Sequence, residues 1–209
     1  MAFIFINSDY FQGELNLSNI ATGSIEEGIL TQKIDYYKRR YFETLLGYEL
    51  ATTFLEEMES YSPNNPTLTY QGWLDLAFGT TYVGDDEVVY KWKGFRTHDS
   101  PNVSDTDEFI SPFANYVYCK HLQQISVVTT SMGAGSANVE NMASRSPIDK
   151  IVEAWNQMCE WHWHLHNMIM TSIEDYDGYI GEKYPPTFVK GYQITENRNL
   201  FLPINSFNL

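Results

Sequence analysis

Basic residues are scarce in this sequence of 209 residues: 13 Lys and Arg stand against 27 Asp and Glu, a formal charge of −14 with histidine neutral. A protein that binds nucleic acid by neutralising phosphates needs a basic face, and so does one that docks on an anionic membrane. The composition therefore argues against both classes of protein. A strongly negative surface is instead suited to repelling DNA.

Cysteines and long apolar runs are also few. The only cysteines are Cys119 and Cys159, too few for a disulfide framework, and both fall in predicted helices among apolar neighbours. We expect them to be small buried hydrophobes in a reducing compartment. The N-terminus has no basic region of the kind that opens a signal peptide, and no stretch approaches the roughly 18 apolar residues of a membrane span.

Motifs of nucleophilic and nucleotide chemistry are missing as well. The sequence contains no Gly-x-Ser-x-Gly and no phosphate-binding loop, and Gly133-Ala134-Gly135 has neither the third glycine nor the preceding strand of a dinucleotide fingerprint. Acidic groups at 85–87 and 105–108 lack the spacing of an EF-hand, so we interpret them as solvated loops rather than calcium sites. The residues thus give enzymatic chemistry little support.

Helix signals dominate what the chain does contain, together with enough hydrophobic (43%) and aromatic (15%) residues for a sizeable core. Ser24 and Glu27 form a capping box, in which the two side chains satisfy free backbone N–H groups at a helix start. Apolar residues then recur at helical spacing up to Leu45, and Gly47 stands where a helix-ending glycine is common. A second helix is predicted from 48 to about 60.

Three further helices and one strand are predicted downstream. Ser-Pro pairs at 111–112 and 146–147 place serine at the N-cap and proline at the first position of two long helices. The stretch between these helices is rich in Ser, Gly, Ala and Asn, which predicts a flexible loop. The expected elements are a short helix at 70–78, a strand or hairpin arm at 88–95, and long helices from 112 to about 128 and from 147 to about 173.

The predicted fold class is mainly α: a helical bundle with two long helices, a small β-hairpin or strand insert and an extended C-terminal arm. The arm is predicted because the chain beyond Gly178 has no helical period. The expected organisation is an extended N-terminal segment over 1–23, a helical domain over 24–177 with an insert at 79–110 and a flexible loop at 130–146, and the arm over 178–209.

Three alternating histidines, His162, His164 and His166, are the most conspicuous candidate site. Helical spacing of about 100° per residue places His162 and His166 about 40° apart inside the apolar stripe of the last helix, and His164 on the opposite face. One helix therefore cannot close all three around an ion. A metal site with His162 and His166 would need a further ligand, such as His121 or Cys119. We favour core or interface histidines bonded to carbonyls or carboxylates.

Aromatic side chains recur along the C-terminal arm. Because an extended segment cannot bury them alone, the arm must either pack on its own domain or dock on another subunit, and the sequence leaves both alternatives open. Aromatic side chains are favoured anchors of protein interfaces. The candidate partner-binding residues are Tyr184, Phe188, Tyr192, Phe201, Leu202 and Phe207.

The order of several segments carries more information than the fold class. Tyr41 to Leu50 contains a Leu-Gly-x-Glu-Leu element at a helix-turn-helix corner, and Gly72 to Leu76 with the later Gly79 predicts a short helix and a glycine turn. The remaining segments of the pattern are Tyr90 to Phe95, Phe113 to Tyr118, Thr129 to Gly133 and Lys150 to Asn156. Over about residues 24 to 175, this order resembles the head–tail connector (adaptor) proteins of tailed bacteriophages, which bind under the portal.

The resemblance implies a structural virion protein that is not an enzyme and needs no cofactor. Such proteins form a homo-oligomeric ring, typically a dodecamer, that joins capsid to tail, binds the phage portal protein and presents a surface to a downstream tail or ring protein. DNA would pass through the lumen without specific binding, and a negative lumen would suit that passage. The expected location is the head–tail junction of the virion, assembled in the bacterial host cytoplasm, with no membrane contact.

Two hypotheses from other functional classes remain open. The pair His162 and His166 supports a metal-binding helical enzyme or module, which elemental analysis of the purified protein would detect. The aromatic arm supports a small helical binding module whose protein partner lies outside any virion.

Overall fold

The computed structural model describes residues 3–11, 13–17, 23–61, 72–84, 86–96, 109–125, 127–130, 133–136, 147–174 and 201–203. In these ranges the chain is mainly helical, with a small antiparallel hairpin beside a helical bundle, so the predicted fold class is confirmed. Of the predicted C-terminal arm, only Phe201 to Pro203 belong to the described residues. No helix in these ranges has both the length and the apolarity that a membrane crossing needs.

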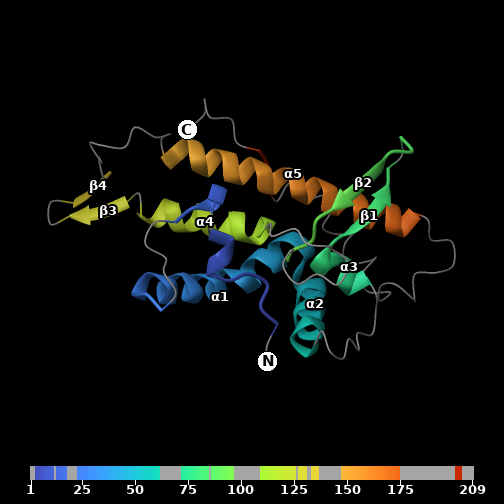
Figure 1. Cartoon of the computed structure of the whole chain (residues 1–209), viewed down its shortest axis with the longest axis horizontal. Helices are drawn as coiled ribbons and strands as arrows, with labels where there is room; N and C mark the ends of the chain where they lie inside the picture. The colour runs from blue at the N-terminus through green and yellow to red at the C-terminus, as the bar shows by residue number, and fades with distance from the viewer. Residues whose placement is uncertain are drawn as a thin grey trace.

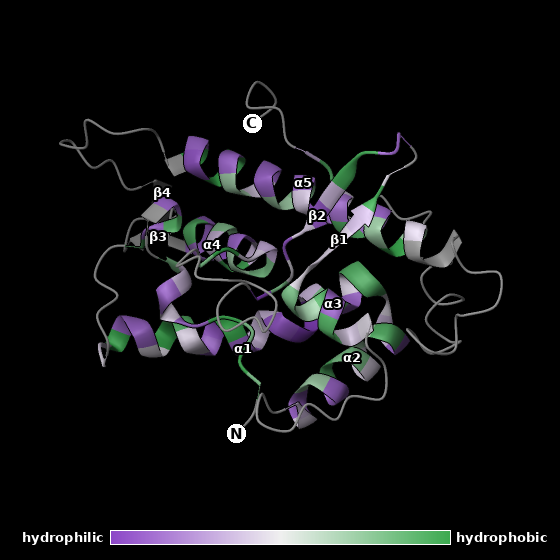
Figure 2. Cartoon of the chain, turned by 45° about the vertical axis from the view of Figure 1, so that its right-hand side comes forward, coloured by the Kyte–Doolittle hydropathy of each residue, from purple (hydrophilic) through white to green (hydrophobic). Residues whose placement is uncertain are grey.

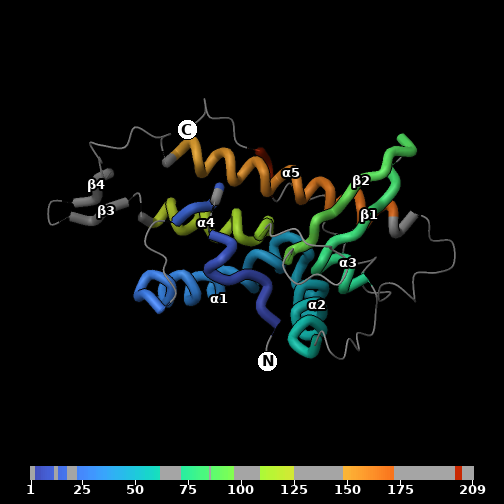
Figure 3. The backbone as a smooth tube through the Cα atoms, viewed as in Figure 1, coloured from blue at the N-terminus to red at the C-terminus, as the bar shows by residue number. Residues whose placement is uncertain are grey.

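Three helices form the body of the molecule. Helix α1 (Ile25–Leu46), helix α4 (Pro112–Ile125) and helix α5 (Pro147–Glu174) lie in one stack with α4 in the middle (Figure 1). The tube in Figure 3 shows that α4 runs antiparallel to both neighbours. Hydrophilic and hydrophobic stretches alternate along the turns of α1 and α5 (Figure 2), as in helices that bury one face.

A corner at Gly47 joins α1 to helix α2 (Tyr48–Ser60), and helix α3 (Gly72–Phe78) packs beside α2. Gly47 has φ 83° and ψ 160°, a backbone region that essentially only glycine adopts. Its N–H donates to the Glu43 carbonyl at 3.0 Å, which closes the last turn of α1. The predicted helix end and the immediate start of a second helix are both confirmed.

The serine cap predicted at the start of α1 is confirmed, whereas the Glu27 side chain reaches the N–H of Gly23, one residue before the N-cap, rather than that of Ser24. Ser24 Oγ accepts a hydrogen bond from the Glu27 N–H at 3.1 Å, and the Glu27 carboxylate accepts one from the Gly23 N–H at 2.5 Å. The same carboxylate accepts the Ser8 hydroxyl at 2.8 Å, which ties the N-terminal segment to α1. The hydrogen bond from Gly23, and then that from Ser8, hold the pKa of Glu27 below its ordinary value, so the cap carries a negative charge at neutral pH.

The N-terminal segment differs from the extended segment expected over 1–23. Its described residues include two 3-10 turns, Ser8–Phe11 and Gly13–Leu15, and most of its apolar side chains are buried in the core, Ile4 being exposed. The ring of Phe5, for example, lies 4.9 Å from the ring of Phe42 on α1. The segment is therefore part of the core, held by tertiary contacts that leave no periodic signal in the sequence.

Strands β1 (Thr80–Val83) and β2 (Val89–Trp92) form an antiparallel hairpin that packs against α5, which confirms the predicted strand (Figure 1). The base of the hairpin is fixed beside α3. Gly79 has φ 90°, and a Cβ there would collide with the backbone at Trp92. The indole N–H of Trp92 donates to the Leu76 carbonyl at 3.1 Å, so strand and helix are joined at this point.

A second hairpin stands where the sequence predicts a helix end and a flexible loop. Helix α4 ends at Ile125 rather than at about 128, and strand β3 (Val127–Thr130) pairs antiparallel with strand β4 (Gly133–Ser136). Strand β3 is a run of β-branched residues, which are restricted in a helix and fit a strand well. The loop predicted over 130–146 is therefore wrong for Thr130 and for β4, and the rest of it lies outside the described residues.

Large aromatic side chains from every layer meet in the core. The Phe42 ring of α1 lies 4.9 Å from the Phe95 ring after β2 and 5.7 Å from the Phe113 ring of α4. Burial of apolar surface contributes roughly 25 cal/mol per Å², so rings of this size supply much of the drive to fold. The largest fully buried aromatic side chains are Trp73, Trp92, Tyr41, Tyr118, Phe11, Phe42, Phe54, Phe95 and Phe113.

Cys119 and Cys159 are buried free thiols, as predicted. Burial raises the pKa of Cys119 to about 12 and that of Cys159 to about 11, so both remain protonated at neutral pH. Cys119 Sγ lies 3.5 Å from the Ile151 carbonyl across the interface of α4 and α5. Both side chains thus act as small apolar groups in the core.

Candidate interaction surfaces

The alternating histidines of α5 divide between two faces, as predicted. His162 is 8% exposed, and its Nε2 lies 2.6 Å from the Tyr41 hydroxyl of α1. Burial lowers the pKa of His162 to about 3, so the ring is neutral. His164 points the other way, and its Nδ1 lies 3.0 Å from the Tyr82 hydroxyl of β1. The partners of both rings are tyrosine hydroxyls, not the carbonyls or carboxylates favoured from the sequence.

The candidate metal ligands do not gather around one point. Within the described ranges, no group of three His, Cys, Asp or Glu side chains is placed to hold an ion. His121, considered as a further ligand, has its Nδ1 3.0 Å from Lys33 Nζ instead. Burial, and then the charge of Lys33, lower the pKa of His121 to about 4. The pair His162 and His166 therefore gains no third ligand from α4.

The candidate partner-binding residues include Phe201, which the structure places against the core of its own domain. The Phe201 ring lies 4.8 Å from the His162 ring and 5.8 Å from the Trp155 ring. The indole N–H of Trp155 donates to the Leu202 carbonyl at 2.8 Å, whereas the Leu202 side chain is exposed. These contacts favour packing on its own domain for this part of the arm. Tyr184, Phe188, Tyr192 and Phe207 lie outside the described residues.

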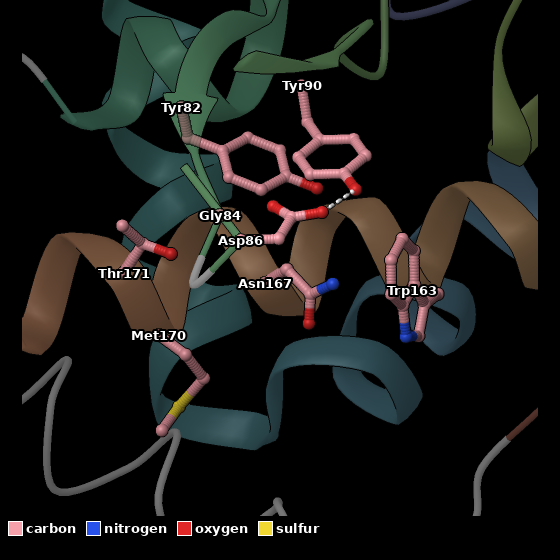
Figure 4. Close-up of a pocket in the computed structure, with 8 residues that line it drawn as sticks. All are labelled: Tyr82, Gly84, Asp86, Tyr90, Trp163, Asn167, Met170 and Thr171. Carbon is pink, nitrogen blue, oxygen red and sulfur yellow. Dashed lines mark hydrogen bonds between the residues drawn. The ribbon is translucent and has the colours of Figure 1, made fainter. Parts of the chain in front are cut away.

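A pocket of about 340 Å³ lies between the hairpin and the C-terminal half of α5 (Figure 4), and the sequence did not single it out. Register explains one wall, because Tyr82 and Tyr90 are direct cross-strand partners and so present their rings on one face. The other wall is one face of α5, where helical spacing brings Trp163, Asn167, Met170 and Thr171 together. The lining residues are Tyr82, Gly84, Asp86, Tyr90, Trp163, Asn167, Met170 and Thr171.

The pocket combines a carboxylate with aromatic rings. The Tyr82 and Tyr90 rings stack at 5.7 Å, and the Trp163 ring stands nearly perpendicular to Tyr90 at 6.3 Å. The Asp86 carboxylate accepts hydrogen bonds from the Tyr90 hydroxyl at 2.7 Å and from the Val88 N–H at 3.2 Å. These bonds, that of Tyr90 first, hold the pKa of Asp86 below its ordinary value, so the carboxylate is ionised. Such a site suits a cation.

Exposed apolar side chains gather in two places. On α1, Ile25, Ile29 and Tyr36 are between 45% and 80% exposed and lie within about 40° of one another around the helix; we name them the α1 patch. On the hairpin, Val83 and Val89 are cross-strand partners on the face opposite to Tyr82 and Tyr90, and Val88 precedes β2; we name these three exposed side chains the hairpin patch. The N-terminal half of α1 and the tip of the hairpin stand at opposite ends of the long axis of the molecule (Figure 1).

A scan against protein-family models, a search of curated proteins and a search of solved structures returned no match for this chain.

Proposed function

We propose that this chain is a structural virion protein, a connector subunit that forms a ring beneath a phage portal, joins capsid to tail and continues the DNA channel. One observation supports this above others. The segments that resemble connector proteins follow one another in the fold as a helical corner, a short helix, a hairpin insert, an aromatic helix and a long last helix. Rings from these segments, Phe42, Phe95 and Phe113 among them, pack together in one core.

The two exposed patches also support a ring. A ring closes through a heterologous interface, in which one surface of each subunit fits a different surface of its neighbour. The α1 patch and the hairpin patch consist of different residues, and the elements that carry them, the N-terminal half of α1 and the hairpin, stand at opposite ends of the molecule (Figure 1). A pair of unlike apolar surfaces in this arrangement suits head-to-tail contact better than a two-fold dimer.

The charge of the chain suits a channel for DNA. Each copy contributes a formal charge of −14, and a ring multiplies it around its axis. Like charges repel the phosphates of a duplex, so DNA slides past such a wall without binding to it. Exposed acidic side chains on α1 and α2 include Glu26, Asp35, Glu49, Glu56 and Glu59. In this role the chain carries out no catalysis and needs no cofactor.

Mixing the purified chain with the isolated portal complex encoded by the same genome tests the proposal. Mass photometry should show the portal alone gaining the mass of a whole ring of copies, with few partly filled complexes because ring closure is cooperative. A chain that stays monomeric and leaves the mass of the portal unchanged would contradict the proposed function. A portal or capsid gene beside the gene for this chain is the matching genomic expectation.

A further inference from the structure

We infer that the pocket between the hairpin and α5 is a binding site for a small organic cation with a quaternary ammonium head, of the kind that choline carries. The charge of the pocket, the aromatic rings that line it and the hydrogen bonds that its polar groups already make all favour this class of ligand. One copy of the chain is enough to form the site, so it exists whether or not the chain assembles into a ring.

The pocket is negative. Asp86 contributes a carboxylate to its wall, and hydrogen bonds from the Tyr90 hydroxyl and then from the Val88 N–H hold the pKa of that carboxylate below its ordinary value. Among the described residues that line the pocket, none is basic. Lys91, next to Tyr90 in β2, lies on the opposite face of the hairpin because side chains alternate along a strand. A ligand that complements this lining therefore carries a positive charge.

Three aromatic rings give the pocket faces that attract a cation. Tyr82 and Tyr90 are cross-strand partners whose rings stack at 5.7 Å, and Trp163 stands nearly perpendicular to Tyr90 at 6.3 Å. Trp163 is 53% exposed, so much of its ring is free to meet a ligand. Figure 4 shows Asp86 beside the two tyrosine rings, with Trp163 at the side. Cages of aromatic rings are the usual sites for quaternary ammonium groups.

Polar groups of the pocket are already bonded within the chain, which distinguishes among organic cations. The Tyr82 hydroxyl lies 3.0 Å from His164 Nδ1 and also bonds the Asn167 amide. Each oxygen of Asp86 accepts one hydrogen bond, that of the Tyr90 hydroxyl among them. A primary ammonium or a guanidinium brings several N–H groups, and each of them needs an acceptor once it leaves water. A quaternary ammonium has no N–H group, so it loses least on entering this pocket.

The size and the charge of the pocket favour a small free cation. Its volume of about 340 Å³ lies near the lower end of the roughly 300–1,000 Å³ that is typical of ligand pockets. Asp86 and Glu87 are exposed at the hairpin turn, so they repel an anionic group attached to the cation. We therefore expect a free organic cation rather than the phosphate-linked head of a lipid.

Isothermal titration calorimetry with choline and matched probes tests the inference. The alcohol in which carbon replaces the nitrogen of choline has the same shape without the charge. Ethanolamine keeps the charge as a primary ammonium, guanidinium spreads it over a flat group, and phosphocholine adds a phosphate. We expect choline to bind with an affinity on the order of millimolar, and each of the other probes to bind about tenfold more weakly or less.

Variants of the chain assign the binding to this pocket. Asp86→Asn removes the charge and Trp163→Ala removes a ring, and each should weaken choline binding by about tenfold. Glu87→Gln is the control for charge, because Glu87 is exposed beside Asp86 but does not line the pocket. Tyr36→Ala is the control for loss of an exposed ring on another helix. In about 0.15 M salt, which screens distant charges, both controls should bind choline within about twofold of the wild type.

Folding is followed by thermal melting of every variant. Trp163→Ala changes an exposed side chain on α5, so it remains informative if Asp86→Asn disturbs the hairpin turn. Three results would overturn the inference: no binding of choline at concentrations of tens of millimolar, another probe that binds as tightly as choline, or pocket variants that bind choline like their controls. None of them decides the proposed function, because a ring formed on the portal would still be seen in the mass of the complex.

Discussion

The Tyr41 hydroxyl and the His162 ring form a buried pairing of polar groups that joins α1 to α5 at the centre of the aromatic core. A buried hydrogen-bonding group without its partner costs about 1–3 kcal/mol. We therefore expect Tyr41→Phe to lower the free energy of unfolding by about 1–3 kcal/mol in urea denaturation. Tyr36→Phe, which removes an exposed hydroxyl from the same helix, should change it by less than about 0.5 kcal/mol. Equal losses in the two variants would show that the pairing adds nothing.

The same buried histidine makes stability depend on pH. Its pKa is about 3 in the folded chain against an ordinary 6.5, so the unfolded state binds the extra proton as the pH falls below 6.5. The stability is thus complete above 6.5 and is lost as the pH falls towards 3. Between about pH 7.5 and about pH 5, His162 should remove about 2 kcal/mol from the free energy of unfolding.

Urea denaturation at the two pH values measures this loss. His162→Gln keeps an amide near the Tyr41 hydroxyl but cannot titrate, so its stability should fall by about 2 kcal/mol less over the same interval. Other groups, His121 among them, also lose stability in acid and are common to both proteins. If the variant and the wild type lose the same amount, His162 is not the group responsible.

At the scale of the elements, a glycine inside α1 and the glycine that follows its last residue should respond in opposite ways to the same substitution. Gly47→Ala puts a side chain at φ 83° and ψ 160° in the corner to α2, and should cost about 1–3 kcal/mol. Gly28→Ala lies inside the helix with nothing within 4 Å of the added Cβ, and should add up to about 1 kcal/mol. Thermal melts that move in the same direction would contradict this description of the corner.

The end of the described chain offers a second test of an element. Phe201 is half-buried against rings of α1, α4 and α5, so Phe201→Ala should lower the free energy of unfolding by about 1–3 kcal/mol. Leu202→Ala is the control, because its side chain is exposed and its backbone carbonyl still accepts the Trp155 hydrogen bond. If Phe201→Ala is as stable as Leu202→Ala, the segment does not contribute to the fold.

The helices of this chain could be predicted because their signals lie within a turn or two. Ser24 and Gly47 act on their own backbone neighbours, and Ser111 Oγ accepts the Phe113 N–H at 3.2 Å where a Ser-Pro start was predicted. The β3–β4 hairpin is not predicted, because the apolar pattern of α4 continues into a run of β-branched residues and periodicity alone does not mark where the helix ends.

The candidate site could not be predicted because its parts come from distant places in the chain. Tyr41 and His162 are separated by 121 residues, and the pocket needs a hairpin turn and a helix face to meet. In the sequence, Asp86 is recognisable only as part of an acidic loop. Trp163 is recognisable only as a residue outside the apolar stripe of α5. Periodicity can state which face of α5 lies away from the core, but not that a hairpin covers that face.

At the scale of the whole molecule, unlike ends and a large negative charge together define how copies can meet. The charge of −14 opposes contact between copies, so any interface must bury apolar surface and pair the few basic side chains with acidic ones. The exposed apolar side chains of α1 and of the hairpin meet the first of these needs. Added salt should therefore screen the general repulsion between copies and favour their contact.

We propose that copies of this chain close into a ring that continues the portal channel. Cryo-electron microscopy of the chain mixed with the portal complex of the same genome tests it most directly. We predict an extra ring of density on the portal axis, with an open centre wide enough for a DNA duplex and one copy of the α1–α4–α5 stack in each repeat. Portal particles without added density, or density that is off the axis and does not close, would contradict the claim.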